Sequence, residues 1–328
     1  MLQAGPFVAG RDTPKTRDFH FRFTAGAITD MEGEVQETNR RYYEVTGQPE
    51  KQGLREDYSF EDFGMDGGYA AYGFSLENAG RLWTLQWDMT AMNPSTDAVA
   101  IRNYYIFVSD IEYGGRSYEY MQIPEGTAFS VDMFAILGDI RGLCTPVTFK
   151  PSNSFRLIPF FDIGLFVFYA SYDIDAGPAR GVIQYLDPPE DFVVGGQGSG
   201  SLAAGVPELG AGLELRIGRD DGPNFVLQGN YAWLNYSGST EWLLSSSHRA
   251  KDLDLEHSNT KVKLAFELPM AEGRAMSLGL MYHVIESDAS VTVRDDLTDE
   301  EIAERHERFD KEAYIKISSF MATLGFTF

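Results

Sequence analysis

The feature that most constrains this chain is an alternation of apolar and polar side chains with a period of two, which recurs along most of its length. In one clear case Trp83, Leu85 and Trp87 alternate with Thr84 and Gln86. Successive side chains of a β-strand point to opposite faces, so this period predicts strands with one apolar and one polar face. A membrane-spanning helix is not expected, because no stretch reaches the roughly 18 uncharged apolar residues that such a helix needs.

The alternating segments follow one another as hairpins, and their connections are short and long in turn. The long connections cover about residues 32–63, 93–125, 173–205, 238–256 and 291–310. This arrangement is typical of bacterial barrels, which have short periplasmic turns and long external loops. The chain therefore predicts a single all-β domain over residues 1–328. It would be a transmembrane, up-and-down antiparallel β-barrel of about ten strands, with residues 1–17 as an N-terminal periplasmic segment.

Two alternatives stay open for this architecture. Residues 99–122 could form an additional hairpin, which would either project outward or give a barrel of twelve strands. A soluble barrel or sandwich would show the same alternation, because periodicity alone does not separate the inside from the outside. Strands long enough to cross a bilayer at a tilt, about 9–11 residues, favour the membrane.

Composition narrows the classes of function. The chain has 328 residues, is 43% hydrophobic and carries a formal net charge of -22, so clustered cations for a nucleic-acid partner are missing. The single cysteine, Cys144, allows no internal disulfide framework. The first residues lack the basic and apolar regions of a secretory signal, so an exported protein would be represented here by its mature chain, without a signal peptide.

The last segment is apolar at every second position up to the final residue. Its side chains are Phe320, Ala322, Leu324, Phe326 and Phe328. This pattern resembles the C-terminal signature of bacterial outer-membrane β-barrel proteins. The resemblance implies a location in the outer membrane, surrounded by membrane lipid and lipopolysaccharide, with a possible protein partner at the external loops.

One irregularity interrupts this last segment, because Ile315 and Ile317 have the opposite parity to Phe320 and the apolar residues after it. A β-bulge near Ser318 and Ser319 would explain the change. The alternative explanation is a strand top that stands clear of the membrane.

The two parities assign side chains to the lipid or to the lumen of the predicted barrel. Phe21, Trp87, Leu213 and Leu264 are expected to face lipid. The side chains expected in the lumen are His20, Arg22, Asp88, Asp132, Asp162, Glu214, Arg216, Lys261, Lys263, Glu267 and His283. Their mixed signs predict a plug of ion pairs, with a proton relay or a narrow pore as the functional alternative. A wide pore is not expected, because open channels need roughly 16 strands.

These observations favour a non-enzymatic barrel that acts as a scaffold, a surface-interaction protein or a narrow channel through acidic external loops. A second hypothesis comes from residues 231–242, which resemble the strand that rises into the fourth external loop of the omptin family of outer-membrane proteases. That resemblance implies a hydrolase site at the external rim, for which Asp88, Asp97 and His248 are the candidates. The chain departs from the omptin pattern, since it has no Asp-x-Asp pair there and no aspartate two residues before His248.

The remaining motifs predict loop structure. Residues 195–201 are rich in glycine and predict a flexible external loop. Residues 297–311 predict a short helix on the last external loop, because Thr298 and Glu301 form a capping box. Acidic clusters at 56–57, 61–62, 187–191 and 295–296 lack the spacing of a dedicated calcium site. No cofactor and no metal site are expected.

Overall fold

The computed structural model describes residues 6–11, 18–39, 55–102, 104–113, 116–183, 190–219, 222–239, 251–270, 274–293 and 309–328, and their regular structure consists of strands. None of these residues belongs to a helix that could cross a membrane. The strands are β1 (Phe7–Ala9), β2 (Asp18–Asn39), β3 (Arg55–Ser59), β4 (Tyr69–Ala79), β5 (Trp83–Met92), β6 (Ser95–Val99), β7 (Tyr104–Tyr113), β8 (Arg116–Ile123), β9 (Ala128–Cys144), β10 (Val147–Ser152), β11 (Phe155–Ile183), β12 (Glu190–Gly218), β13 (Asn224–Ser239), β14 (Lys251–Pro269), β15 (Ala275–Val293) and β16 (Phe309–Thr327).

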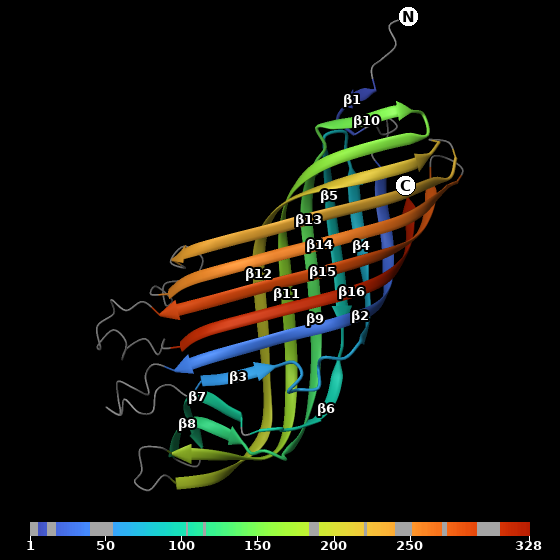
Figure 1. The fold of residues 1–328 in the computed structure, drawn as a ribbon. Coiled ribbons are helices and arrows are strands. Elements are labelled where there is room, and N and C mark those ends of the chain that lie inside the picture. Colours follow the sequence, from blue (N-terminus) through green and yellow to red (C-terminus); the bar gives the residue numbers. More distant parts are fainter. Residues whose placement is uncertain are drawn as a thin grey trace, which may run out of the picture.

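Ten of these strands form a closed antiparallel ring. Its order is β11-β12-β13-β14-β15-β16-β2-β4-β5-β9, and β9 pairs back with β11 to close it. The all-β, antiparallel class predicted from the sequence is confirmed. The strand β1 and the C-terminal end of β16 lie at the same end of the ring (Figure 1). The short connections β4–β5, β12–β13 and β14–β15 also lie there, and we refer to it as the terminal end.

The other strands attach to this ring. At the terminal end, β1 pairs with β10, and β10 pairs with β11. At the opposite end, β3 pairs with β2, and β6 continues the line of β5 along β9. The strands β7 and β8 form a hairpin that joins the far end of β11 through β8. Residues 99–122 therefore contain an additional hairpin that lies outside the ring.

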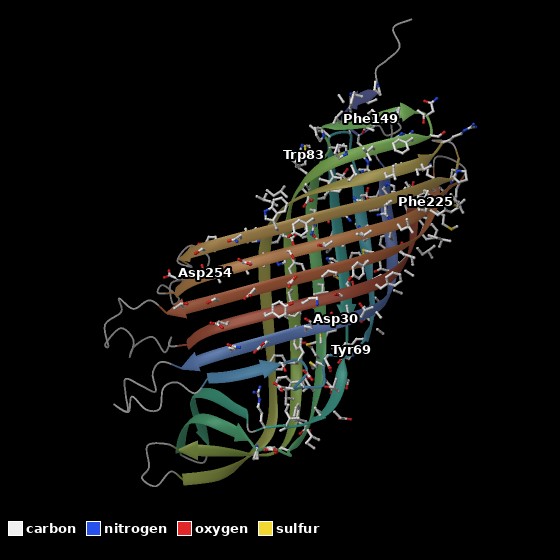
Figure 2. All side chains as sticks on the ribbon, viewed as in Figure 1. Asp30, Tyr69, Trp83, Phe149, Phe225 and Asp254 are labelled. Atoms are coloured by element: carbon white, nitrogen blue, oxygen red, sulfur yellow. The ribbon has the colours of Figure 1, made fainter. Side chains whose placement is uncertain are left out.

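The outer face of the ring carries a continuous apolar belt near the terminal end. On β2 it covers outward side chains between residues 19 and 27, and on β16 those between residues 320 and 328. Level with them on the other strands are exposed large side chains: Trp87, Ile140, Phe161, Ile163, Leu213, Leu227, Phe266, Leu278 and Leu280. Figure 2 shows Trp83, Phe149 and Phe225 toward this end of the molecule and Asp254 far from it. The belt is about as tall as a tilted strand that crosses a bilayer.

The polarity of both faces inverts beyond the belt. The outer face there carries Asp30, Glu32, Glu34, Asp254, Glu256, Glu286, Asp288 and Lys316. The inner face, which is polar behind the belt, becomes apolar at the same level. Its buried side chains include Ile28, Met31, Met133, Leu137, Phe168, Ile285, Ile317 and Met321, against which Phe60 and Phe63 pack. The long strands of the ring thus have their apolar side chains on the outer face within the belt and on the inner face beyond it.

A β-bulge lies where β2 passes through this transition. Ser318 and Ser319 pair with Asp30 and Ile28, so Thr29 is the extra residue on β2. The bulge is adjacent to the position expected from the sequence, but it does not explain Ile315 and Ile317. Those two side chains point inward with the same parity as Ser319, and they are apolar because the interior is apolar at that level.

Beyond the belt the wall of the ring divides into two lobes. The pairing of β12 with β13 ends at Leu209 and Trp233, whereas β11–β12 pairing continues to Ile183 and Glu190. One lobe contains the far ends of β13–β16 and β2 with β3, and the other contains those of β9, β11 and β12 with β6–β8. The lobes diverge in Figure 1. Strands extend past the predicted loop boundaries, because within the described residues of these loops the segments 32–39, 55–59, 95–99, 104–113, 116–123, 173–183, 190–205, 238–239, 251–256, 291–293 and 309–310 are strand.

Candidate functional site

The interior of the ring behind the belt is filled by charged side chains that contact one another across the ring. Its carboxylates are Glu77, Asp88, Asp139, Asp162, Glu208, Glu214 and Glu267; its cations are Arg11, Arg22, Arg141, Arg156, Arg216, Lys261 and Lys263. We call these residues the polar plug. The two lists are equally long, so the plug carries little net charge although the whole chain is strongly acidic.

Arg11 closes the plug at the terminal end. It comes from the segment after β1, and its guanidinium lies 3.3 Å from Glu77 on β4 and 3.0 Å from Glu214 on β12. Since β4 and β12 are far apart around the ring, Arg11 links opposite walls. The backbone N–H of Arg11 donates to the carbonyl of Arg81 at 2.6 Å, and that of Gly10 donates to Pro146 at 2.9 Å. The N-terminal segment is therefore fixed across this end.

The same layer is extended on both sides of Arg11. Arg22 lies 3.0 Å from the second oxygen of Glu77. Arg216 bonds to Glu214 and lies 3.2 Å from Glu267. A cavity of about 30 Å³ remains beside these groups, lined in part by Arg22, Arg216 and Lys263. That volume holds about two water molecules and is too small for a solute.

Arg141 and Lys261 organise the middle of the plug. The Lys261 ammonium lies 2.6 Å from both Asp88 and Asp139. Arg141 is 2% exposed and donates to Asp139 at 2.6 Å, to Glu208 at 2.7 Å and to Asp162 at 3.4 Å. A buried cation of this kind is stable only while its counter-charges are in place.

A smaller group connects the plug to the apolar interior. Glu208 accepts hydrogen bonds from the Asn259 amide at 2.9 Å and contacts Nε2 of His257 at 2.7 Å. Nδ1 of His257 lies 2.7 Å from the Ser287 hydroxyl, and Phe166 stacks on the imidazole at 5.4 Å. His283 bonds to Asn259 at 2.8 Å.

The structure places ten of the eleven predicted lumen side chains inside the ring: His20, Arg22, Asp88, Asp162, Glu214, Arg216, Lys261, Lys263, Glu267 and His283. Asp132 instead lies exposed on the outer face. The expectation for Asp132 was wrong because its apolar neighbours Val131 and Met133 were assigned to lipid, whereas they are buried in the apolar interior. Phe21, Trp87, Leu213 and Leu264 lie on the outer face.

The hydrolase candidates do not form a common site. Asp88 is buried in the plug and pairs with Lys261 and Lys263, whereas Asp97 is exposed on the outer face of β6. His248 lies outside the described residues. The two aspartates are thus on opposite faces of the sheet, where they cannot act on one water molecule.

Several residues of the interior were missed by sequence reasoning. Glu77 has the parity of the inward Ser75, but it lies close to the short connection between β4 and β5, where the alternation ends. Asp139 and Arg141 continue the parity of the apolar Leu137, which is opposite to that of Asp132, the residue expected in the lumen. Arg11 precedes the ring and has no alternation around it, so only the tertiary structure reveals its role.

The remaining sequence motifs have different outcomes. Residues 195–201 are part of β12 rather than a loop. The helix predicted at 297–311 falls mostly outside the described residues, and its last three residues belong to β16. In the described part of the chain no group of acidic, histidine or cysteine side chains is arranged to hold a metal ion. Among the predicted acidic clusters, Asp62 pairs with Arg102 at 2.9 Å.

No protein-family model and no curated protein matches the chain. Among solved structures it is similar to the outer membrane protease OmpT from Escherichia coli, at 12% identity and a TM-score of 0.39, over 96% of this chain and 99% of that one. It is also similar to the toluene transporter TodX of P. putida, at 8% identity and a TM-score of 0.21, over 96% and 90% of the two chains. A third is OccK2 of Pseudomonas aeruginosa, at 7% identity and a TM-score of 0.15, over 93% and 98%. The similarity to all three outer-membrane proteins is weak, that to the omptin included.

Proposed function

We propose that this chain is a bacterial outer-membrane β-barrel with a plugged interior, which acts as a scaffold and surface-interaction protein. The observation that carries the proposal is the inversion of polarity at one level around the ring. Between that level and the terminal end, the outer face is apolar and the interior is charged. On the other side of that level, the outer face is acidic and the interior is apolar. A soluble ring has no reason to expose an apolar belt of this size.

The belt has the composition and height that a lipid-facing surface requires. It spans about nine residues on β2 and on β16, and a tilted strand needs about 9–11 residues to cross the hydrocarbon core. Tyr231 and Trp233 stack at 5.7 Å where the belt gives way to polar side chains. Aromatic side chains are typical of this boundary. A closed ring also satisfies its backbone hydrogen bonds without water, as the bilayer demands.

The orientation follows from the connections. Bacterial barrels have short turns on the periplasmic side and long extensions outside. The terminal end, with Arg11 and the short turns, then faces the periplasm, and the two lobes project from the cell. Their acidic outer faces would meet lipopolysaccharide and external partners. Lys316 lies 3.0 Å from Glu32 there, and this hydrogen bond raises the pKa of Lys316.

Insertion into membranes tests the proposal directly. The chain, refolded in detergent, is expected to stay with the detergent-rich phase. It should also migrate differently on a gel before and after heating, because a closed ring resists unfolding by the detergent of the gel sample until it is heated. A chain that is monomeric and soluble without detergent would contradict the membrane assignment.

A conductance measurement tests the plug. In planar bilayers the inserted protein is expected to show no stable open-channel steps, whereas an open porin of about 16 strands, measured alongside, shows large ones. The reason is that Arg11 and Lys261 link opposite walls, Arg141 ties β9 to β11 and β12, and the cavity beside Arg22 and Arg216 holds only about two water molecules. Reproducible open steps from the unmodified chain would replace the plugged scaffold by a narrow channel.

A further inference from the structure

We propose that Ser287, His257 and Glu208 form a serine-hydrolase site for esters of apolar carboxylic acids. The three side chains come from β15, β14 and β12 and lie in one hydrogen-bonded row, with 2.7 Å between Ser287 Oγ and His257 Nδ1 and 2.7 Å between His257 Nε2 and Glu208 Oε1. A nucleophile, a base and an acid that orients the base are the three parts of a hydrolytic triad, which is defined by geometry and not by sequence order.

The hydrogen bonds around Glu208 assign the proton on the imidazole. Glu208 accepts from Arg141 at 2.7 Å and from Asn259 at 2.9 Å, so its carboxylate acts as an acceptor toward every neighbour. In the neutral imidazole, Nε2 of His257 then carries its hydrogen toward Glu208, and Nδ1 presents a lone pair to Ser287. This is the tautomer in which histidine can take the proton of the serine hydroxyl.

The acid and the base of the proposed site are more deeply buried than its nucleophile, as a hydrolytic site requires. The side chains of Glu208 and His257 are fully buried, whereas Ser287 is partly exposed. Phe166 stacks on the imidazole and excludes water from one of its faces. The base and the orienting acid are thus held in a dry setting, and the nucleophile remains the accessible member.

The surroundings of Ser287 indicate the class of substrate. Ser287 pairs across the strands with His257 on one side and with the inward-facing Ile315 on the other. The next row of inward side chains toward the tips of the strands consists of Leu255, Ala289 and Ala313, all half-buried. In this proposal the strip contacts the apolar acyl chain, and the ester carbonyl lies at Ser287.

The row of three residues lies close to the point where two strands of the wall separate. Glu208 is the first inward residue of β12 beyond the point where β12 and β13 separate at Leu209 and Trp233. The row of three residues therefore lies where the two lobes begin, next to the edge of the apolar belt that is farther from the terminal end.

The reaction balances without a cofactor. Ser287 Oγ attacks the ester carbonyl carbon while its proton passes to Nδ1 of His257. The bond to the alcohol breaks, and the alcohol leaves with that proton, so that an acyl-serine remains. Water then attacks the acyl-serine, gives one proton to His257 and releases the carboxylic acid, and Ser287 regains its proton.

A fluorophosphonate probe tests the nucleophile in the full chain, refolded in detergent. The folded protein is expected to be labelled on Ser287, as located by mass spectrometry of its peptides. The variant Ser287→Ala should lose the label, and His257→Gln should react at least about 100-fold more slowly, since general-base assistance contributes on the order of 10²–10⁴. The matched control is Ser258→Ala, which removes a hydroxyl next to His257 that points to the outer face, and it should keep full labelling.

The substrate class is tested with p-nitrophenyl esters. The octanoate ester is expected to be hydrolysed at least tenfold faster than the acetate ester, and Ser287→Ala should abolish both activities. The heat shift on a gel shows that each variant is folded. A folded, unmodified chain that takes no label, or a label that persists in Ser287→Ala, would overturn the site and leave the three residues as structural hydrogen bonds. Labelling at Ser287 with equal rates for the two esters would overturn the apolar substrate.

Discussion

Replacing Arg141 by methionine is expected to lower the free energy of unfolding by about 3–5 kcal/mol, which is the loss typical of breaking a buried ion pair. Arg141 donates to Asp139, Asp162 and Glu208, and its side chain is almost fully buried. Methionine fills much of the same volume but supplies no charge. The three carboxylates would then remain buried with too few counter-charges, because Lys261 already serves both Asp139 and Asp88.

Urea unfolding in lipid vesicles, followed by tryptophan fluorescence, measures this loss. The matched control is Arg219→Met, because Arg219 is exposed in the turn after β12 and its replacement should change the stability by no more than about 0.5 kcal/mol. Equal losses in the two variants would mean that the plug contributes no more than a surface charge does.

Replacing Leu213 by arginine is expected to cost about 2–4 kcal/mol, the range for a cation near the middle of a bilayer on a barrel wall. Leu213 is 45% exposed on the outer face of β12, at the centre of the apolar belt. An arginine at this position would have to leave water for hydrocarbon, or extend several ångströms to reach the headgroups.

The control for this variant is Ser237→Arg. Ser237 also points outward and is exposed, but it lies on β13 beyond the belt, where the neighbouring outer side chains are polar. Its replacement should be nearly neutral. If folding into vesicles tolerates arginine equally well at both positions, the outer face of the belt does not contact lipid.

Sequence periodicity predicted the strands well, because the parity of each segment follows from the geometry of a strand and needs no tertiary information. It could not say which parity faces inward where the interior changes from charged to apolar. Val131, Met133 and Leu137 look like a lipid-facing row, yet they are buried against the apolar interior. Asp132 was therefore placed inside, and it is outside.

The same ambiguity explains the irregular last strand. Ile315 and Ile317 seemed to break the pattern of Phe320 and Leu324, but the alternation of β16 is continuous, with the two isoleucines on the inner face and the other two side chains on the outer face. The apolar face changes sides because the apolar side chains form the outer belt near the terminal end and the packed interior beyond it. A one-residue irregularity is present, but it lies at Thr29 on the partner strand.

The candidate site was predictable only in part. Charged residues at inward parity, such as Asp88 and Lys261, could be placed in the interior from the alternation alone. The pairing between them could not, because Asp88 and Lys261 are separated by 173 positions in the chain. Ser287, His257 and Glu208 show no spacing that links them, and their proximity results from the register of β12, β14 and β15.

The pairing of β2 with β16 has a consequence for the order of assembly. These strands are the first and last of the ring, and their contacts join Thr327 to His20. No shorter piece of the chain can complete the wall, since every intermediate without β16 leaves two open edges. Arg11 can reach Glu77 and Glu214 only after β12 is in place. Contacts between such distant parts of a chain form slowly, because long loops must close first. Closure of the wall therefore depends on the C-terminal strand, and a chain that lost it would expose both edges to other molecules of its kind.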